Sequence, residues 1–288
     1  MRNENIIYSL ILDYARNDER IRAVELNGSR ANKNAKKDIF RDFDIIYYVT
    51  DVKHFTDDRS FIAYFGNLVI MQCAEDQSDF TADDSPYFHY LMQFDDGNRI
   101  DLTFYDVTKA GQKQRESLSI ILLDKDNILD KNHISDERDY FPKKPSREEF
   151  HYCTNEFWWV SIYVAKGICR KEEIYAKTLL DQYVRAALVE MLEWYIGTLT
   201  SFSESPGKLG KNYERLLGKE LYQKYLDTYC GSDLKEIWDS LFLMCELFRK
   251  FSKAVADSFS FIYPDGYDRN VTDYLARLKN LPDNPTDI

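Results

Sequence analysis

The chain has 288 residues, which is long enough for two domains, and its hydrophobic content of 44% excludes general disorder. A formal net charge of −11 argues against a nucleic-acid partner held through its phosphates. The sequence has no apolar run that could span a bilayer, no secretory signal and no Cys-x-x-Cys pattern among its five cysteines, so we expect a cytoplasmic protein without a membrane partner.

The first half of the chain predicts helices and strands around a small mixed sheet. Apolar residues at helical spacing predict a helix over residues 3–18, and residues 53–64 are also predicted to be helical. Gly97 stands where the tight turn of a hairpin needs a glycine. An acidic, unpatterned stretch predicts a surface loop over residues 76–84. Runs rich in Ile, Val, Tyr and Phe predict strands over residues 21–27, 42–50, 67–72, 87–94, 98–105 and 119–123.

The second half predicts helices. A polar segment with two prolines, residues 125–145, predicts the connection, and Ser146 and Glu149 have the spacing of a helix capping box. A long helix is predicted over residues 171–196, ended by Gly197. Further helices are predicted over residues 219–229, 233–260 and 268–279, with a frayed tail from residue 282. We therefore predict an α+β protein with a mixed-sheet domain over residues 1–145 and a helical domain over residues 146–288, with a ligand cleft between them.

A glycine turn after the first predicted strand suggests a phosphate-binding element. Gly28 permits a sharp turn and a close approach of the backbone to a ligand. Ser29 offers a hydroxyl and main-chain N–H groups to phosphate oxygens, and Arg30 adds a bidentate donor. We predict that these three residues hold the phosphates of a nucleotide.

Three aspartates suggest a divalent cation near this turn. Asp42 and Asp44 alternate with Phe43 along one predicted strand, so both project from the same face. Two carboxylates at such a short distance repel each other unless they bind a proton or a cation. Mg²⁺ prefers oxygen ligands of this kind. Asp101 lies between Ile and Leu in another strand, where an unpaired charge is costly, so we expect it to share the metal or the substrate.

At these motifs the chain resembles the aminoglycoside 6-adenylyltransferases, the streptomycin-modifying members of the nucleotidyltransferase superfamily. The likeness continues through Glu156–Val160, Ala165–Arg170 and Met191–Gly197, and it covers nearly the whole chain. It implies an N-terminal nucleotidyltransferase-like domain and a transfer of AMP from ATP to the 6-hydroxyl of streptomycin, with release of pyrophosphate. It also suggests Asp181, in the helical domain, as the base that takes the proton of the hydroxyl.

Several alternatives stay open at this point. Asp101 is the alternative base. The alternative acceptors are a hydroxyl of a protein, a hydroxyl of another molecule, and a different position of an aminoglycoside. A binding module that has lost its chemistry is disfavoured by the intact Asp42, Asp44 and Asp101. Aromatic residues at helical spacing more often belong to the core than to a site, and two adjacent tryptophans cannot both face the same way. A basic loop flanked by glycines is more often only a turn. We therefore leave four residues outside the predicted site, namely Trp158, Trp159, Lys208 and Lys211.

Overall fold

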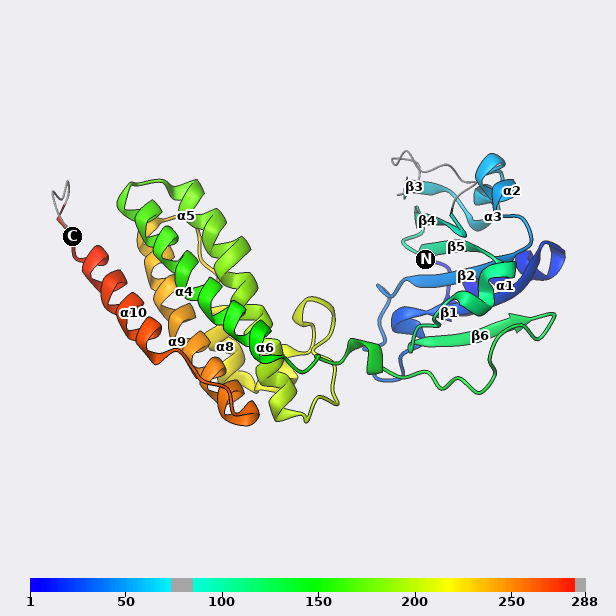
Figure 1. The fold of residues 1–288 in the computed structure, drawn as a ribbon. Coiled ribbons are helices and arrows are strands. Elements are labelled where there is room, and N and C mark those ends of the chain that lie inside the picture. The colour runs from blue at the N-terminus through cyan, green and yellow to red at the C-terminus, as the bar shows by residue number, and fades with distance from the viewer. Residues whose placement is uncertain (74–84, 283–288) are drawn as a thin grey trace. The chain divides into compact units, whose positions relative to one another are not determined.

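The computed structural model describes residues 1–73 and 85–282 and separates into two compact units, Met1–Asp139 and Tyr140–Ile288 (Figure 1). The predicted acidic loop over residues 76–84 and the predicted tail beyond residue 282 lie outside the described residues. The proposed domain boundary after residue 145 stays a prediction. Each unit has its own hydrophobic core.

Within the described residues, the first unit contains a six-stranded mixed sheet with the order β3-β4-β5-β2-β1-β6 (Figure 1). The β2–β5 pair is parallel, and the other neighbouring pairs are antiparallel. The predicted strands agree with the observed ones to within one residue at each end, and the predicted α+β class is confirmed. The strands are β1 (Ile21–Asn27), β2 (Phe43–Val49), β3 (Leu68–Gln72), β4 (Tyr87–Phe94), β5 (Arg99–Asp106) and β6 (Ser119–Asp124).

Helices cover one face of this sheet. In α1 (Glu4–Asn17), the side chain of Asn3 caps the first turn by accepting a hydrogen bond of 3.0 Å from the Ile6 amide. The prediction of one helix over residues 53–64 was wrong, because the chain forms α2 (Val52–Asp57) and α3 (Ile62–Phe65). The Asp58 carboxylate accepts a hydrogen bond from the Ser60 amide and stabilises the intervening turn.

The opposite face of the sheet carries a buried group of charged side chains. Glu25 of β1 is fully buried and accepts a hydrogen bond of 2.6 Å from the Tyr48 hydroxyl and another from the Arg115 guanidinium. The Lys113 ammonium lies 4.0 Å from the same carboxylate. Burial alone would raise the pKa of Glu25, but the hydrogen bonds from Tyr48 and Arg115 outweigh burial and lower it. Glu25 therefore remains ionised and neutralises two cations on this face.

We expect Glu25→Gln to destabilise the first unit by about 1.5–3 kcal/mol, because the variant leaves the partly buried Arg115 and Lys113 without their counter-charge. Glutamine keeps the volume of the side chain, so the loss reports charge rather than packing. Urea denaturation followed by far-UV circular dichroism measures the change. Glu19→Gln is the control, since Glu19 pairs with Arg22 at the surface with its side chain 85% exposed. Equal stability of the two variants would contradict a structural role for the Glu25 charge.

The second unit is helical (Figure 1). The capping box is confirmed: the Ser146 side chain accepts a hydrogen bond from the Glu149 amide, and the Glu149 side chain accepts one from the Ser146 amide. The helices predicted over residues 219–229, 233–260 and 268–279 are present, whereas α7 was not predicted. The helices are α4 (Arg147–Cys169), α5 (Glu173–Leu179), α6 (Arg185–Leu199), α7 (Tyr213–Leu217), α8 (Lys219–Leu226), α9 (Leu234–Phe259) and α10 (Asp265–Lys279).

The long helix predicted over residues 171–196 contains a change of helical form. A π-helical segment, Leu180–Val184, joins α5 to α6. Gly197 does not end the helix as predicted, because α6 continues to Leu199. A Cβ atom at Gly197 would overlap the ring of Phe202, so this glycine permits close packing instead. Within residues 1–73 and 85–282, every helix is too short or too polar to cross a lipid bilayer.

Candidate active site

Three polar side chains form a row across the sheet where β1 ends and where β2 and β5 begin. Asn27 pairs with Asp44 across the β1–β2 ladder, and Asp44 pairs with Asp101 across the parallel β2–β5 ladder. We call Asn27, Asp44 and Asp101 the polar row. Phe43 and Ile45, which flank Asp44 in β2, are in the helix-covered core, so the row projects from the other face. The prediction that the Asp101 strand neighbours the Asp44 strand is confirmed.

Gly28 brings the turn after β1 against the polar row. Its φ of +69° lies in the left-handed region, where glycine is favoured. A Cβ atom at this position would overlap the carboxylate of Asp44. The Gly28 amide donates a hydrogen bond of 3.2 Å to the carbonyl of Leu118, which ties the turn to the segment before β6. Ser29 follows in the same turn and is partly exposed, and its contact with a phosphate stays a prediction.

Arg30 is engaged by the protein itself. Its guanidinium donates hydrogen bonds of 2.9 Å to the Asp42 carbonyl and 2.8 Å to the Arg41 carbonyl, and it lies 2.9 Å from the Glu4 carboxylate. It also stacks on the ring of Phe43, with 3.6 Å between the guanidinium carbon and the ring centroid. The side chain is only 6% exposed. These contacts fix the beginning of β2 next to the glycine turn, and the predicted phosphate contact of Arg30 stays a prediction.

The acidic side chains of this site interact unfavourably when all are ionised. Burial, followed by the charges of Asp101 and Asp42, raises the pKa of Asp44 to about 6. The Arg99 guanidinium lowers it, but by less. Asp44 is therefore partly protonated near neutral pH, and a positive charge placed beside it would favour its ionised form.

The raised pKa of Asp44 predicts a pH-dependent stability. A carboxyl group with a raised pKa in the folded state stabilises the fold below its unfolded pKa of about 3.9, and this contribution is lost as the pH rises through about 6. We expect the free energy of unfolding of the metal-free wild type to fall relative to Asp44→Asn between about pH 4 and pH 7. Urea denaturation in the presence of a chelator measures this difference. Parallel pH profiles of the two proteins would contradict the prediction.

Arg99 provides the positive charge next to the aspartates in this structure. Its guanidinium donates two hydrogen bonds of 2.7 Å to the two carboxylate oxygens of Asp101 and lies 3.7 Å from the Asp42 carboxylate. In the part of the chain that the structure describes, no group of three His, Cys, Asp or Glu side chains is arranged to hold a metal ion. The assignment of Asp42, Asp44 and Asp101 as metal ligands therefore stays a prediction.

Asp181, the predicted base, lies in the π-helical segment of the second unit. Its side chain is 35% exposed and forms an ion pair with Lys177. Arg185 lies 3.3 Å from the other carboxylate oxygen and is itself buried, donating hydrogen bonds to the hydroxyl and the carbonyl of Thr228. Such π-helical segments are rare and often occur at functional sites. Asp181 is thus held in one orientation by its neighbours, and its role as a base stays a prediction.

Two residues of the site were not singled out from the sequence. Asn27 directly precedes the glycine turn, and a polar residue at the end of an otherwise apolar strand was the available signal. Arg99 lies two residues before Asp101, which places both side chains on the same face of β5. Polar residues at strand ends, and two polar residues on one face of a strand, are both common. Only the pairing of the strands indicates that Asn27 and Arg99 belong to the site.

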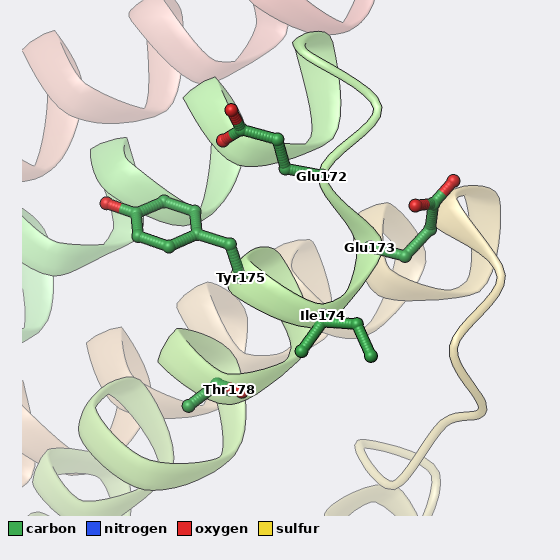
Figure 2. Close-up of a pocket in the computed structure, with 5 residues that line it drawn as sticks. All are labelled: Glu172, Glu173, Ile174, Tyr175 and Thr178. Atoms are coloured by element: carbon green, nitrogen blue, oxygen red, sulfur yellow. The ribbon is translucent and has the colours of Figure 1, made fainter.

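The residues left outside the predicted site have ordinary surroundings. Trp158 is buried in the helical core, while Trp159 is 55% exposed and makes an edge contact with Tyr163. Lys208 lies in a short turn beside the exposed Leu209. An open hollow of about 520 Å³ at the beginning of α5 is shown in Figure 2, where the carboxylate of Glu173 points away from the side chain of Tyr175. This hollow brings no catalytic set of side chains together.

The comparison with known families decides the classification. Residues 1–278 match the model of the family described as streptomycin adenylyltransferase. The chain belongs to this family. The match spans both units and confirms the resemblance stated from the sequence.

Curated relatives are similar to this chain over nearly their whole length. An aminoglycoside 6-adenylyltransferase of Bacillus subtilis (strain 168) is 40% identical over 280 residues, which cover 96% of this chain and 98% of the relative. One from Campylobacter jejuni is 38% identical over 280 residues, covering 97% and 96%. A crystal structure of an aminoglycoside 6-adenyltransferase from Bacillus subtilis aligns with a TM-score of 0.49 at 36% identity, covering 98% of this chain and 100% of that one. The chain is therefore an adenylyltransferase by family.

Proposed function

We propose that this protein transfers AMP from ATP to the 6-hydroxyl of an aminoglycoside, with streptomycin as the first acceptor to test. The observation that supports the proposal is the polar row beside the glycine turn in a chain that matches the streptomycin adenylyltransferase family over residues 1–278. The acceptor class rests on the names of the relatives, which are aminoglycoside 6-adenylyltransferases.

In the proposed reaction, the acceptor oxygen bonds to the α-phosphorus of ATP. The bond from that phosphorus to the oxygen that bridges it to the β-phosphate breaks, and pyrophosphate leaves. Asp181 takes the proton of the hydroxyl, with Asp101 as the alternative. Ser29 and the backbone of the glycine turn bind phosphate oxygens. Arg30 acts on the backbone of Arg41 and Asp42, since these carbonyls occupy its guanidinium.

We further propose Mg²⁺ as the metal and Asp42, Asp44 and Asp101 as the residues that hold it. The oxygen donors fit a hard divalent cation, and a cation beside Asp44 would offset the burial and the charges of Asp101 and Asp42 that raise its pKa. The side-chain oxygen of Asn27, buried without a hydrogen-bond partner, is a further donor of the same chemistry. A bound cation would neutralise charge on the phosphates. Because Arg99 holds both oxygens of Asp101, metal binding by Asp101 requires this ion pair to open.

Pyrophosphate release tests the function. We expect ATP and Mg²⁺ to yield pyrophosphate only when an aminoglycoside is added, and mass spectrometry should show that streptomycin gains one AMP. Nuclear magnetic resonance of the product locates the modified hydroxyl, which we expect at position 6. Labelling of a protein substrate with AMP, without modification of any aminoglycoside, would replace the proposal with a protein adenylyltransferase.

A further inference from the structure

Asn27 has an unusual environment for a polar side chain. It is the last residue of β1 and only 6% of its surface is exposed. Its side-chain oxygen is fully buried and accepts no hydrogen bond from any residue in the ranges 1–73 and 85–282. An unpaired buried acceptor costs about 1–3 kcal/mol, so a residue retained in this state calls for an explanation.

The neighbours of Asn27 in the sheet do not supply the missing donor. On one side its partner is Asp44, whose carboxyl group forms no hydrogen bond with this oxygen. On the other side its partner is Ser119, whose hydroxyl donates a hydrogen bond of 2.9 Å to the Glu116 carbonyl. The adjacent Gly28 amide is bonded to the Leu118 carbonyl. A donor or a cation from outside the chain is therefore the natural partner of this oxygen.

We propose that the side-chain oxygen of Asn27 is a neutral ligand of the divalent cation bound at the polar row. This inference rests on the metal assignment made under the proposed function. Hard cations accept amide oxygens together with carboxylates. An amide oxygen adds a ligand without adding another negative charge next to Asp44, whose neighbours Asp42 and Asp101 already repel it. A bound cation would therefore give the Asn27 oxygen a partner and would also reduce the repulsion among the carboxylates.

Binding of Mn²⁺ to the metal-free full chain, in the absence of ATP, tests the inference. The free ion is counted by electron paramagnetic resonance, so the readout does not depend on turnover. Asn27→Leu keeps the size of the side chain and removes the oxygen, and we expect its affinity for Mn²⁺ to fall about tenfold or more. Asn27→Asp restores an oxygen ligand with a charge, and we expect it to bind Mn²⁺ at least as tightly as the wild type.

Two controls separate loss of a ligand from loss of structure. Metal-free Asn27→Leu should unfold at the same temperature as the wild type or higher, since the variant removes an unpaired acceptor. Asn98 is buried to a similar degree, at 7% exposed, but its amide donates hydrogen bonds to the Arg2 carbonyl and the Asp96 carboxylate. We expect Asn98→Leu to lower the unfolding temperature and to leave the Mn²⁺ affinity unchanged.

The possible outcomes test the role of Asn27 separately from the metal assignment on which it rests. Wild-type affinity in Asn27→Leu, with loss of Mn²⁺ binding in Asp42→Asn, overturns the role of Asn27 and leaves the metal assignment standing. Wild-type affinity in both variants, or no binding to the wild type, overturns both. Unchanged Mn²⁺ affinity with weaker ATP binding in Asn27→Leu also overturns the inference, because the oxygen would then meet the nucleotide rather than the cation.

Discussion

Asp44→Asn should lower the turnover by roughly a thousandfold, the upper range for removing one preorganised charged group from a reaction site. Asparagine keeps the shape of the side chain and removes the charge that a cation in the polar row requires. The pKa of Asp44 is raised by burial and by Asp101 and Asp42, so losing its charge also relieves repulsion in the metal-free protein. We therefore expect the variant to fold and to be at least as stable as the wild type without metal.

Steady-state measurement of pyrophosphate release with saturating ATP and streptomycin determines the turnover of Asp44→Asn. Asp51→Asn is a matched control, because Asp51 follows the other end of β2 and caps α2 by accepting a hydrogen bond from the His54 amide. Asparagine caps helices as well as aspartate does, so this variant should keep its turnover and its stability. Near-normal turnover of Asp44→Asn would remove Asp44 from the metal site.

Asp181→Asn should cut the turnover about 100-fold or more and leave ATP binding almost unchanged, if Asp181 takes the proton of the acceptor hydroxyl. The competing interpretation is a helix ion pair, since Lys177 and Arg185 both contact this carboxylate. Such a pair contributes only about 0.3–0.5 kcal/mol, and its loss would change neither quantity much.

Asp239→Asn is the control for this experiment. Asp239 lies in α9 and forms an (i, i+4) ion pair of 2.8 Å with Lys235, so it reproduces the helix pair on an exposed surface of the same unit. The turnover and the ATP binding of this variant should match the wild type. An Asp181→Asn enzyme that behaves like Asp239→Asn would show that Asp181 belongs to a surface pair, and Asp101 would become the base to test.

Most of the fold was predictable from the sequence because strands and helices differ in the period of their apolar residues. The strand β2 alternates Phe43, Ile45 and Tyr47 in the core with Asp44 on the opposite face, and this alternation was visible without a structure. The break between α2 and α3 was not visible, since the local hydrogen bond of Asp58 competes with the helix.

The residue types of the candidate site were visible in the sequence, but the contacts between these residues were not. Arginine beside a glycine turn predicts a phosphate contact for Arg30, which stays a prediction, whereas its hydrogen bonds to the Arg41 and Asp42 carbonyls were not visible in the sequence. Which donor meets which acceptor depends on the pairing of β2 with β5, and that pairing joins segments that are distant in the sequence. The lack of a hydrogen-bond partner for the Asn27 oxygen also depends on how the strands are paired, so it could not be predicted from the sequence.

The parallel pairing of β2 with β5 also determines when the carboxylates meet during folding. The two strands are joined through α2, α3, β3 and β4, and such distant pairings form slowly. Repulsion between Asp44 and Asp101 arises only when this pair closes, so mild acid should speed the refolding of the sheet. All four tryptophans lie in the second unit, so their fluorescence follows the helices while stopped-flow circular dichroism also detects the sheet. Faster refolding of the sheet in mild acid, without a change in the tryptophan phase, would therefore show that the closing of β2 against β5 limits the folding of the first unit.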